Sequence, residues 1–406
     1  MKYNIFTIIQ KNIMYKKLIL IIFALILIGS AAKAQDTMYF YKSGTIVDKL
    51  ATTEIDSITF HDPNLSNHTL MFVGTYTSGS SKGIYEYEFD ALTGKLSLKG
   101  TTTSSNPSFI TIHPNRKWLY AANENSSGTV TAYSIDTALN KLSLLNSQSS
   151  NGNSPCNVSV DFLGKNVMVA NYNSGSFASY TIGTDGKLSA AVSIIQDSGK
   201  SPHAHMIAQG FGNGLVYGSD LGIDKLRAFS LNAATGALTA TSNGASISAG
   251  YGPRHFACHP NNKFIYIITE LKGTVEVYSY NDTTQQLSFV QSISTLPSGV
   301  TATASSADIH ITPNGKYLYA SNRGTNNNIA IYSIDTITGQ LTLLGHQSTK
   351  GTTPRNFCIH PSGKWLLVAN MDSNNIVVFK IDPATGLLTY SGNTITIPNP
   401  VCIKFW

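Results

Sequence analysis

The sequence predicts an all-β protein: a seven-bladed β-propeller of four-stranded blades, closed by a C-terminal strand that joins the first blade. Three observations predict this fold. A hairpin signature occurs seven times, its closing leucines step along the chain by 46, 46, 50, 49, 54 and 47 residues, and the two ends of the repeat array complement each other. A period of this size is typical of propeller blades rather than of a sandwich or a two-layer α/β domain.

The hairpin joins a strand that ends in an aromatic residue to a strand that begins with leucine. Its turn contains Asp or Asn, Thr and Gly, which tolerate tight turns. Polar and apolar residues alternate along the strands, as in residues 128–135, and helical periodicity is absent outside the N-terminal leader. The seven copies span residues 89–96, 133–142, 180–188, 229–238, 278–287, 332–341 and 379–388.

A second repeated element precedes each hairpin and consists of a proline, a short strand, a His-Pro-like turn and another strand, as in residues 107–123. It starts at Pro107, Pro155, Pro202, Pro253, Ser306, Pro354 and Pro400. Only residues 401–406 follow the last start, whereas the first hairpin, residues 70–98, has no such strand before it. We therefore expect the C-terminal strand to enter the first blade, which removes the exposed sheet edges of an open array.

The N-terminal 34 residues are predicted to be an export signal, with Met14 as an alternative start. An apolar run at residues 18–29 follows two lysines and precedes the small-residue cleavage site Ala32–Ala34. This run is shorter than the ~20 residues that a membrane-spanning helix needs. We expect a periplasmic or extracellular protein with no integral membrane segment after cleavage, in which residues 35–65 form a short β segment and residues 66–406 form the propeller.

The charge and cysteine content exclude several classes of partner and cofactor. The net charge is +6, but five lysines and no acidic residues lie in residues 1–34, so the remainder is close to neutral. No basic stripe suited to nucleic acid is visible, and we expect a monomer. The four cysteines have no C-x-x-C spacing, so buried thiols are expected rather than a zinc site: Cys156, Cys258, Cys358 and Cys402.

Residues that break the repeat are the candidates for function, because structural residues recur from blade to blade. His113, His259 and His360 recur before proline and are interpreted as turn residues near the surface. The histidines that do not recur are His203, His205, His255 and His310. The position after the repeat-starting proline holds His203, Arg254 and Arg355 in three blades. At the position after the second strand of the repeated element, Glu270 and Arg323 stand out.

These singular residues are expected to converge at one rim of the central channel, since the two innermost strands of each blade are antiparallel. Three guanidinium groups around a cavity imply an anionic ligand, because the planar fork matches a carboxylate or phosphate. The structural alternative is that the arginines pair with Asp308, Glu124 or Glu270 as ties between blades.

Five segments at these positions resemble the lactonase family of seven-bladed propellers, and the likeness covers residues 70–406. They are Ser201–His205, Gly252–His255, Thr269–Leu271, Ala307–Pro313 and Ser321–Arg323. The resemblance implies a site containing His203 or His205, with Arg254, Glu270 and Arg323. His255 and His310 belong to matching motifs and are expected to bind substrate together with Arg355 and Asp308.

The chemistry expected from this resemblance is hydrolysis of a small anionic sugar lactone. Glu270 or His205 would accept a proton from the attacking water, while Arg254 and Arg323 hold the anion and stabilise the oxyanion. A lactone is already electrophilic, so neither a metal, a cofactor nor a covalent nucleophile is required. The alternatives are an exported propeller that binds a glycan or protein without catalysis, and a cycloisomerase acting on a carboxymuconate. The leader sequence is at odds with a cytosolic phosphogluconolactone substrate, so the identity of the lactone stays open.

Overall fold

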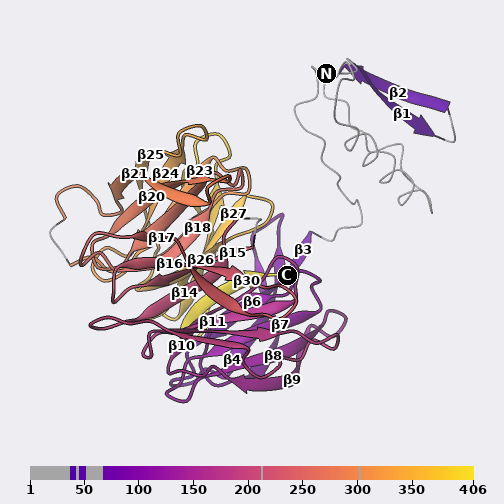
Figure 1. Ribbon diagram of the computed structural model, residues 1–406. Helices are drawn as coiled ribbons and strands as arrows, with labels where there is room; N and C mark the ends of the chain where they lie inside the picture. Colours follow the sequence, from indigo (N-terminus) through magenta and orange to yellow (C-terminus); the bar gives the residue numbers. More distant parts are fainter. Residues whose placement is uncertain (1–36, 43–44, 52–66, 212–213, 301–302) are drawn as a thin grey trace. The chain divides into compact units, whose positions relative to one another are not determined.

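The computed structural model describes residues 37–42, 45–51, 67–211, 214–300 and 303–406, which belong to two compact units, residues 1–65 and 66–406 (Figure 1). In the first unit, β1 (Thr37–Lys42) pairs antiparallel with β2 (Thr45–Ala51). The expected leader and the end of the expected β segment, residues 52–65, lie outside the described residues. Among the described residues, no helix is long and apolar enough to cross a membrane.

The second unit is a ring of seven four-stranded antiparallel sheets, which confirms the predicted propeller. Blade 1, from the axis outward, is β30 (Pro400–Phe405), β3 (His68–Thr75), β4 (Gly83–Asp90) and β5 (Leu96–Thr103). Blade 2 is β6 (Pro107–Ile112), β7 (Trp118–Asn123), β8 (Thr129–Asp136) and β9 (Lys141–Ser149). Blade 3 is β10 (Pro155–Val160), β11 (Asn166–Asn171), β12 (Ser176–Thr181) and β13 (Ser193–Gln196).

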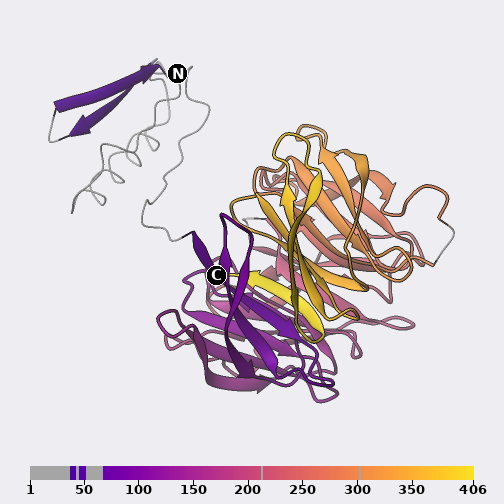
Figure 2. The same cartoon turned by 180° about the vertical axis from the view of Figure 1, so that it is seen from behind.

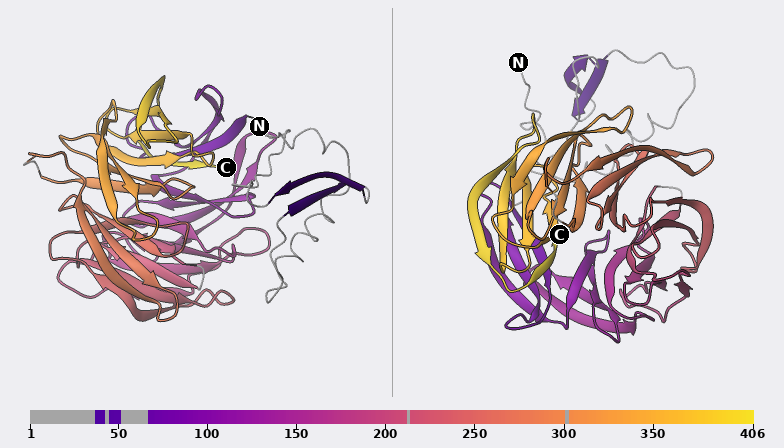
Figure 3. Two further views of the ribbon diagram at one scale, coloured as in Figure 1. Left: turned by 90° about the horizontal axis from the view of Figure 1, so that it is seen from above. Right: turned by 90° about the vertical axis from the view of Figure 1, so that its left-hand side faces the viewer.

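The remaining blades follow in sequence order around the ring, as the colours of Figure 3 show. Blade 4 is β14 (Ala204–Gln209), β15 (Leu215–Asp220), β16 (Lys225–Leu231) and β17 (Leu238–Ser246). Blade 5 is β18 (Pro253–Cys258), β19 (Phe264–Thr269), β20 (Thr274–Asn281) and β21 (Gln286–Ser294). Blade 6 is β22 (Ser306–Ile311), β23 (Tyr317–Asn322), β24 (Asn328–Ile334) and β25 (Leu341–Ser348). Blade 7 is β26 (Pro354–Ile359), β27 (Trp365–Asn370), β28 (Asn375–Ile381) and β29 (Leu388–Thr396).

The ring closes as predicted, because C-terminal β30 pairs antiparallel with β3, with Met71 opposite Phe405. Figure 2 shows the yellow C-terminal strand beside the indigo and purple strands of blade 1. A hydrophobic cluster fills each of the seven interfaces between adjacent blades, for example Trp365 and Leu367 of blade 7 against Val73 and Tyr85 of blade 1. Burial of these strand faces between neighbouring blades fixes the register of every strand, since a slip of one residue would expose the apolar face.

The recurring histidines are buried, so their interpretation as residues near the surface is wrong. His113, His259 and His360 lie in the turns between the first and second strands of their blades, and each is less than 8% exposed. The Nδ1 atom accepts a backbone N–H two residues on, and the Nε2 atom bonds the next blade, at Gly164 O in the case of His113. Their recurrence therefore reflects a tie between blades.

The four cysteines are free thiols, as expected from their spacing. Cys156 and Cys402 are buried, whereas Cys258 and Cys358 are partly buried. All four lie on the innermost strands of their blades.

Candidate active site

One set of candidate residues forms what we call the mouth ring, the residues directly after the second strand of each blade. In every blade the backbone N–H of this residue donates to the C=O of the residue that precedes the first strand, for example Glu270 N–H to Gly252 O. This repeated bond fixes seven equivalent positions: Tyr76, Glu124, Tyr172, Leu221, Glu270, Arg323 and Met371.

A second set forms the bulge ring, one residue into the first strand of each blade. All seven innermost strands have a β-bulge or irregularity here, which leaves one residue unpaired in six blades and two in blade 6. The bulge ring consists of Ser108, Cys156, His205, Arg254, Ala307, Arg355 and Val401. Five of these positions hold neutral or small side chains, so the two arginines are singular within the ring.

The placement of His203 in the same position as Arg254 was wrong. In blade 4 it is Ala204 that pairs with Asp220, just as Pro253 pairs with Thr269 in blade 5. His205 therefore occupies the position of Arg254, and His203 corresponds to the residue before the strand. Pro202 lies two positions before the first residue of β14, and only the strand pairing shows this offset.

Glu270 joins two arginines from neighbouring blades. Its Oε2 atom lies 2.8 Å from Arg254 Nε and 2.9 Å from Arg323 Nη2. Arg254 is 1% exposed and also donates from Nη1 to Ala307 O over 2.6 Å, so blades 5 and 6 both hold it. Burial alone would raise the pKa of Glu270, but Arg254, Arg323 and Arg355 together lower it, and the carboxylate stays ionised. Burial and the other two guanidiniums lower the pKa of Arg254 to about 10.

The third arginine lies beside a second carboxylate. Arg355 Nη2 lies 3.8 Å from Glu124 Oε2, and the same oxygen accepts a hydrogen bond of 2.9 Å from Tyr76 OH. The guanidinium of Arg355 also stacks over the Tyr76 ring at 5.4 Å. Sequence comparison missed Tyr76, because its blade takes its innermost strand from the other end of the chain.

The structural alternative for the arginines is therefore correct in two of its three pairings, with Glu270 and Glu124. These pairs do not neutralise the cluster, since three guanidiniums face two carboxylates. Among the described residues, the mouth and bulge rings carry a net charge of +1, which suits one anionic group of a ligand.

The imidazole of His205 has a ring nitrogen that lacks a hydrogen bond to any described residue. The side chain is 4% exposed, and its Nδ1 atom is buried without a hydrogen bond among the described residues. The Tyr172 ring packs edge-on against it at 5.5 Å and stacks on His203 at 4.6 Å. Burial, followed by the charge of Arg254, lowers the pKa of His205 well below its usual value, so the ring is neutral at pH 7.

The residue after the bulge forms a third set, here called the acceptor ring. In five blades its side chain accepts the backbone N–H of a residue in the next blade, which ties adjacent blades together at the axis. The five acceptors, each followed by the residue whose backbone N–H it accepts, are Asn157 (Ile207), Met206 (Phe256), Asp308 (Phe357), Asn356 (Ile403) and Cys402 (Ile110).

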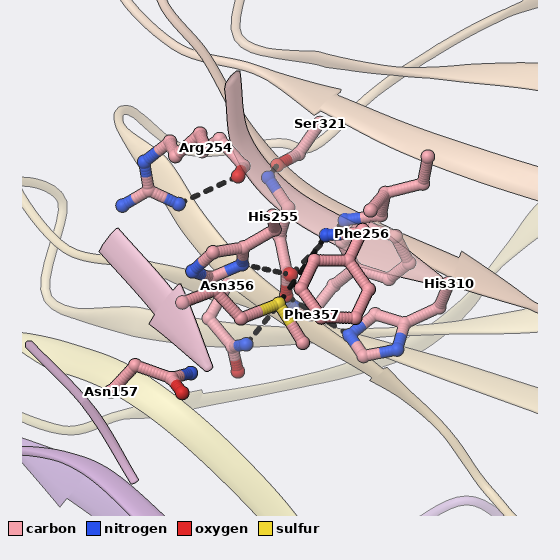
Figure 4. Close-up of polar contacts among 12 residues, drawn as sticks. Asn157, Arg254, His255, Phe256, His310, Ser321, Asn356 and Phe357 are labelled. Carbon is pink, nitrogen blue, oxygen red and sulfur yellow. Dashed lines mark hydrogen bonds and ion pairs between the residues drawn. The ribbon is translucent and has the colours of Figure 1, made fainter. Parts of the chain in front are cut away.

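Asp308 differs from the other members of the acceptor ring because it also accepts from two histidines. His255 Nδ1 lies 2.8 Å from Oδ1, and His310 Nε2 lies 3.0 Å from Oδ2. Asn356 Nδ2 donates to Oδ2 over 2.5 Å, and Figure 4 shows these three side chains directed toward a common point. Burial would raise the pKa of Asp308, but its histidine contacts hold it well below its usual value.

The other nitrogen of His255 is unpaired. Because Nδ1 carries the proton donated to Asp308, Nε2 presents a lone pair, and it is buried without a hydrogen bond among the described residues. Burial, followed by Arg254, lowers the pKa of His255 to about 4. The His205 and His255 rings meet edge to face with centroids 5.1 Å apart.

A cavity of about 10 Å³ lies at the level of these rings and has room for one water molecule. Its walls are Ser108, Phe109, Cys156, His205, Arg254, His255, Arg355, Asn356 and Val401.

The structure thus brings most of the sequence-derived candidates together. Arg254, Glu270 and Arg323 contact one another, while Arg355, His205 and His255 share the cavity with Arg254. The other three candidates lie at the edges of this group. His203 stacks on Tyr172, Asp308 lies behind His255, and His310 contacts Asp308 and Phe357 without an ion pair or hydrogen bond to the arginines. Among the described residues, no three side chains gather in the manner of a metal site.

Comparison with known proteins gives three results. The family model described as "Lactonase, 7-bladed beta-propeller" matches residues 70–405. The chain is 37% identical to the 6-phosphogluconolactonase of Bacillus subtilis, over 82% of this chain and 97% of that protein. A solved structure of the periplasmic gluconolactonase of Pseudomonas aeruginosa superposes with a TM-score of 0.79 at 28% identity, covering 83% of this chain and 99% of that one.

Proposed function

The chain belongs to the lactonase family of seven-bladed β-propellers, and we propose that it hydrolyses a small anionic sugar lactone at the mouth and bulge rings. One observation carries the proposal: three guanidiniums and two carboxylates from four blades lie close to one another, and two of these guanidiniums line a cavity together with neutral histidines. The names of the relatives support the class of substrate, since two of them are a 6-phosphogluconolactonase and a gluconolactonase.

Substrate binding is assigned to the arginines. The charged group of the lactone, a phosphate or a carboxylate, takes up the excess positive charge of Arg323 and Arg355, whose side chains are more exposed than that of Arg254. Glu270 aligns Arg254 and Arg323 and keeps the two guanidiniums close together despite their repulsion. His203 and Tyr172 form a flat wall at the rim, suited to the face of a sugar ring.

The reaction begins when water attacks the ring carbonyl and its proton passes to Nε2 of His205. The oxyanion that develops is stabilised by Arg254 and Arg323, a contribution of about 3–4 kcal/mol per well-placed donor. The ring C–O bond then breaks, and His205 returns the proton to the departing alkoxide. Glu270 is the weaker candidate for the base, because the three arginines lower its pKa and a general base works best with a pKa near the operating pH.

Binding of an anion also activates His205 as a base. Arg254, Arg323 and Arg355 all lower the pKa of His205 through their positive charges. A bound phosphate or carboxylate offsets those charges, so the pKa of His205 rises toward the pH at which the enzyme operates. The base is therefore strengthened only when substrate is present.

Export and a monomeric state are part of the proposal. The leader in residues 1–34 has the three regions of a signal peptide, and the likeness to a periplasmic gluconolactonase is consistent with export. Every candidate residue comes from one propeller, so a single chain carries the whole site. N-terminal sequencing of protein recovered from the periplasm or medium, together with its mass in solution, tests both statements.

The function is tested by incubating purified protein with 6-phosphogluconolactone, glucono-δ-lactone and a carboxymuconate. Acid release from a lactone that is lost in Arg254→Ala and Glu270→Ala supports the proposal. The matched control is Lys263→Gln, which removes an exposed positive charge from the same blade. Turnover of the carboxymuconate alone would indicate the cycloisomerase, and turnover of none of the three would favour a glycan- or protein-binding propeller.

A further inference from the structure

The acceptor ring contains one residue that does more than its structural task. Asn157, Met206, Asn356 and Cys402 each accept the backbone N–H from the next blade with a neutral side chain. A neutral acceptor is therefore sufficient at this position. Blade 6 instead has Asp308, a carboxylate that is 3% exposed. Burial of an ionised group is costly, so the charge requires an explanation beyond the tie to Phe357.

The charge of Asp308 sets the state of His255. Its Oδ1 atom accepts the proton on His255 Nδ1, and this bond fixes the neutral tautomer whose lone pair is on Nε2. The Nε2 atom is buried and has no partner among the described residues. His205 Nδ1, on the neighbouring ring, is buried and unpartnered as well.

Both histidines line one small polar cavity, and their two unpartnered nitrogens indicate a binding site for water. A buried polar atom without a hydrogen bond costs about 1–3 kcal/mol, and two such atoms on adjacent rings double that cost. One water molecule fits the cavity, and it satisfies both atoms if it accepts from one nitrogen and donates to the other. Since His255 Nε2 is the acceptor of the pair, His205 Nδ1 must carry the proton.

We propose that Asp308 and His255 are positioning residues, which act through one buried water to place the proton of His205 on Nδ1 and leave its Nε2 lone pair free for catalysis. The order of groups is Asp308, His255 Nδ1–H, His255 Nε2, water, His205 Nδ1–H and His205 Nε2. This inference rests on the proposed lactonase function, because His205 is the base of that reaction. It replaces the expectation that His255 and Asp308 bind substrate.

The relay has a defined part in the reaction. When Nε2 of His205 takes a proton from the attacking water, the imidazolium that forms still donates from Nδ1 to the buried water. That water donates to His255, whose opposite nitrogen donates to the carboxylate of Asp308. The negative charge thus stabilises the transient cation without a proton leaving Asp308 or His255, and His205 gives its proton to the alkoxide that departs.

The titratable and charged groups around His205 come from four blades. They are Cys156 of β10, Tyr172 after β11, Arg254 and His255 of β18, Arg323 after β23 and Arg355 of β26. The arginines disfavour a second proton on His205, so the neutral ring persists in the free protein and its tautomer is the quantity to measure.

The experiment is a two-bond ¹H–¹⁵N spectrum of the full chain labelled with ¹⁵N-histidine, without any lactone. We expect a protonated Nδ1 and an unprotonated Nε2 for both His205 and His255. In Asp308→Asn the amide oxygen still accepts Phe357 N–H, as Asn356 Oδ1 accepts Ile403 N–H, so the blades remain tied. This variant should lose the fixed tautomer of His255 and shift the spectrum of His205.

A matched control is His259→Asn, which removes a buried histidine that lies outside the site in blade 5, the blade of His255. It should leave the His205 spectrum unchanged. A wild-type His205 that carries its proton on Nε2 overturns the proposal, as does a His205 spectrum unaffected by Asp308→Asn. The wild-type spectrum decides the matter even if Asp308→Asn does not fold.

A kinetic readout separates this inference from the function itself. If the protein is a lactonase, Asp308→Asn should lower kcat roughly 10–100-fold, part of the 10²–10⁴-fold that a general base contributes, and should displace the acid limb of the pH profile while KM changes little. An inactive wild type with the expected tautomers would refute the lactonase and leave the relay standing. An active wild type with the opposite His205 tautomer would refute the relay and leave the lactonase standing.

Discussion

The two ends of the innermost hairpins differ in how their polar groups are satisfied. At the turn end, the same pattern recurs, and both nitrogens of His113, His259 and His360 have partners. At the open end, which carries the mouth and bulge rings, the residues vary among the blades, and buried nitrogens of His205 and His255 have no hydrogen bond among the described residues.

This difference separates stability from function within one hairpin. A repeat protein can reuse one residue at the turn end, as the three histidines show, because each of them makes the same tie to the next blade. The other end faces the axis, where seven positions meet at one place and need not be alike. Unsatisfied polar atoms there are tolerated where a ligand or water completes them. The comparison therefore predicts that substitutions at the open end alter activity and that those at the turn end alter stability.

The largest effect is expected from Arg254→Ala. Loss of this guanidinium removes an oxyanion donor and leaves Glu270 with one arginine, so kcat/KM for lactone hydrolysis should fall about 10²–10³-fold. Steady-state acid release measures the change. Lys263→Gln should retain wild-type activity, and an equal loss in that control would mean that the assay reports general charge rather than the site.

A pair of carboxyl groups, Asp197 and Asp220, also lies at the open end, and it tests whether every polar group there belongs to the active site. The second inner strand ends in Asn in blades 2, 3, 6 and 7 but in Asp220 in blade 4. Burial, opposed by Arg227 and reinforced by a hydrogen bond with Asp220, raises the pKa of Asp197 to about 7. The folded protein therefore holds a proton that the unfolded chain releases near pH 4.

Stability should consequently fall as the pH rises from about 4 to about 7, by an amount on the order of a few kcal/mol. The variant Asp220→Asn should reduce this dependence, because the hydrogen bond and the charge of Asp220 both raise the pKa of Asp197, although burial raises it most, and it should leave lactone turnover unchanged. Denaturant titrations at several pH values measure the slope. A variant that keeps the wild-type slope would refute the effect of Asp220 on the pKa of Asp197. A variant without activity would place Asp220 in the site.

The next effect is expected from His205→Asn, which removes the proposed base at the open end. Activity should fall roughly 10²-fold, because a general base contributes at least that much. The free energy of unfolding should change by less than ~1 kcal/mol, since the ring makes no hydrogen bond to the described residues that could be lost. Parallel kinetics and urea unfolding measure the two quantities, and a stable variant with full activity would exclude His205 as the base.

The smallest effect on catalysis is expected from His259→Asn at the turn end. This change removes the bond to Gly315 O in blade 6 and the bond from Asn261 N, which costs about 1–3 kcal/mol of stability. The kcat of the folded variant should equal that of the wild type. A loss of kcat without a loss of stability would contradict the division between the two ends.

Much of this architecture could be predicted from the sequence because the repeat carries its own internal control. The hairpins fixed the number of blades, and the mismatch between residues 401–406 and residues 70–98 indicated the closure. Comparison of equivalent positions also singled out Arg254, Glu270 and Arg323 without any alignment to other proteins.

Other features depend on strand pairing that the sequence does not display. Pro202 resembles the repeat-starting prolines, so the sequence places His203 in the position of Arg254. The pairing of Ala204 with Asp220 shows that His205 occupies that position. Tyr76 escaped notice because its inner neighbour comes from the opposite end of the chain. The bond between His255 and Asp308 joins neighbouring blades and depends on the bulges of their strands. No local sequence pattern indicates these bulges.

The most direct test of the division between the two ends is a titration of ¹⁵N-histidine-labelled protein with 6-phosphogluconate, the product of the phosphorylated lactone. The account predicts that the imidazole signals of His205 and His255 shift with saturation, while those of His113, His259 and His360 do not move. Shifts confined to the three turn histidines, or no shift of His205 at saturating product, would contradict it.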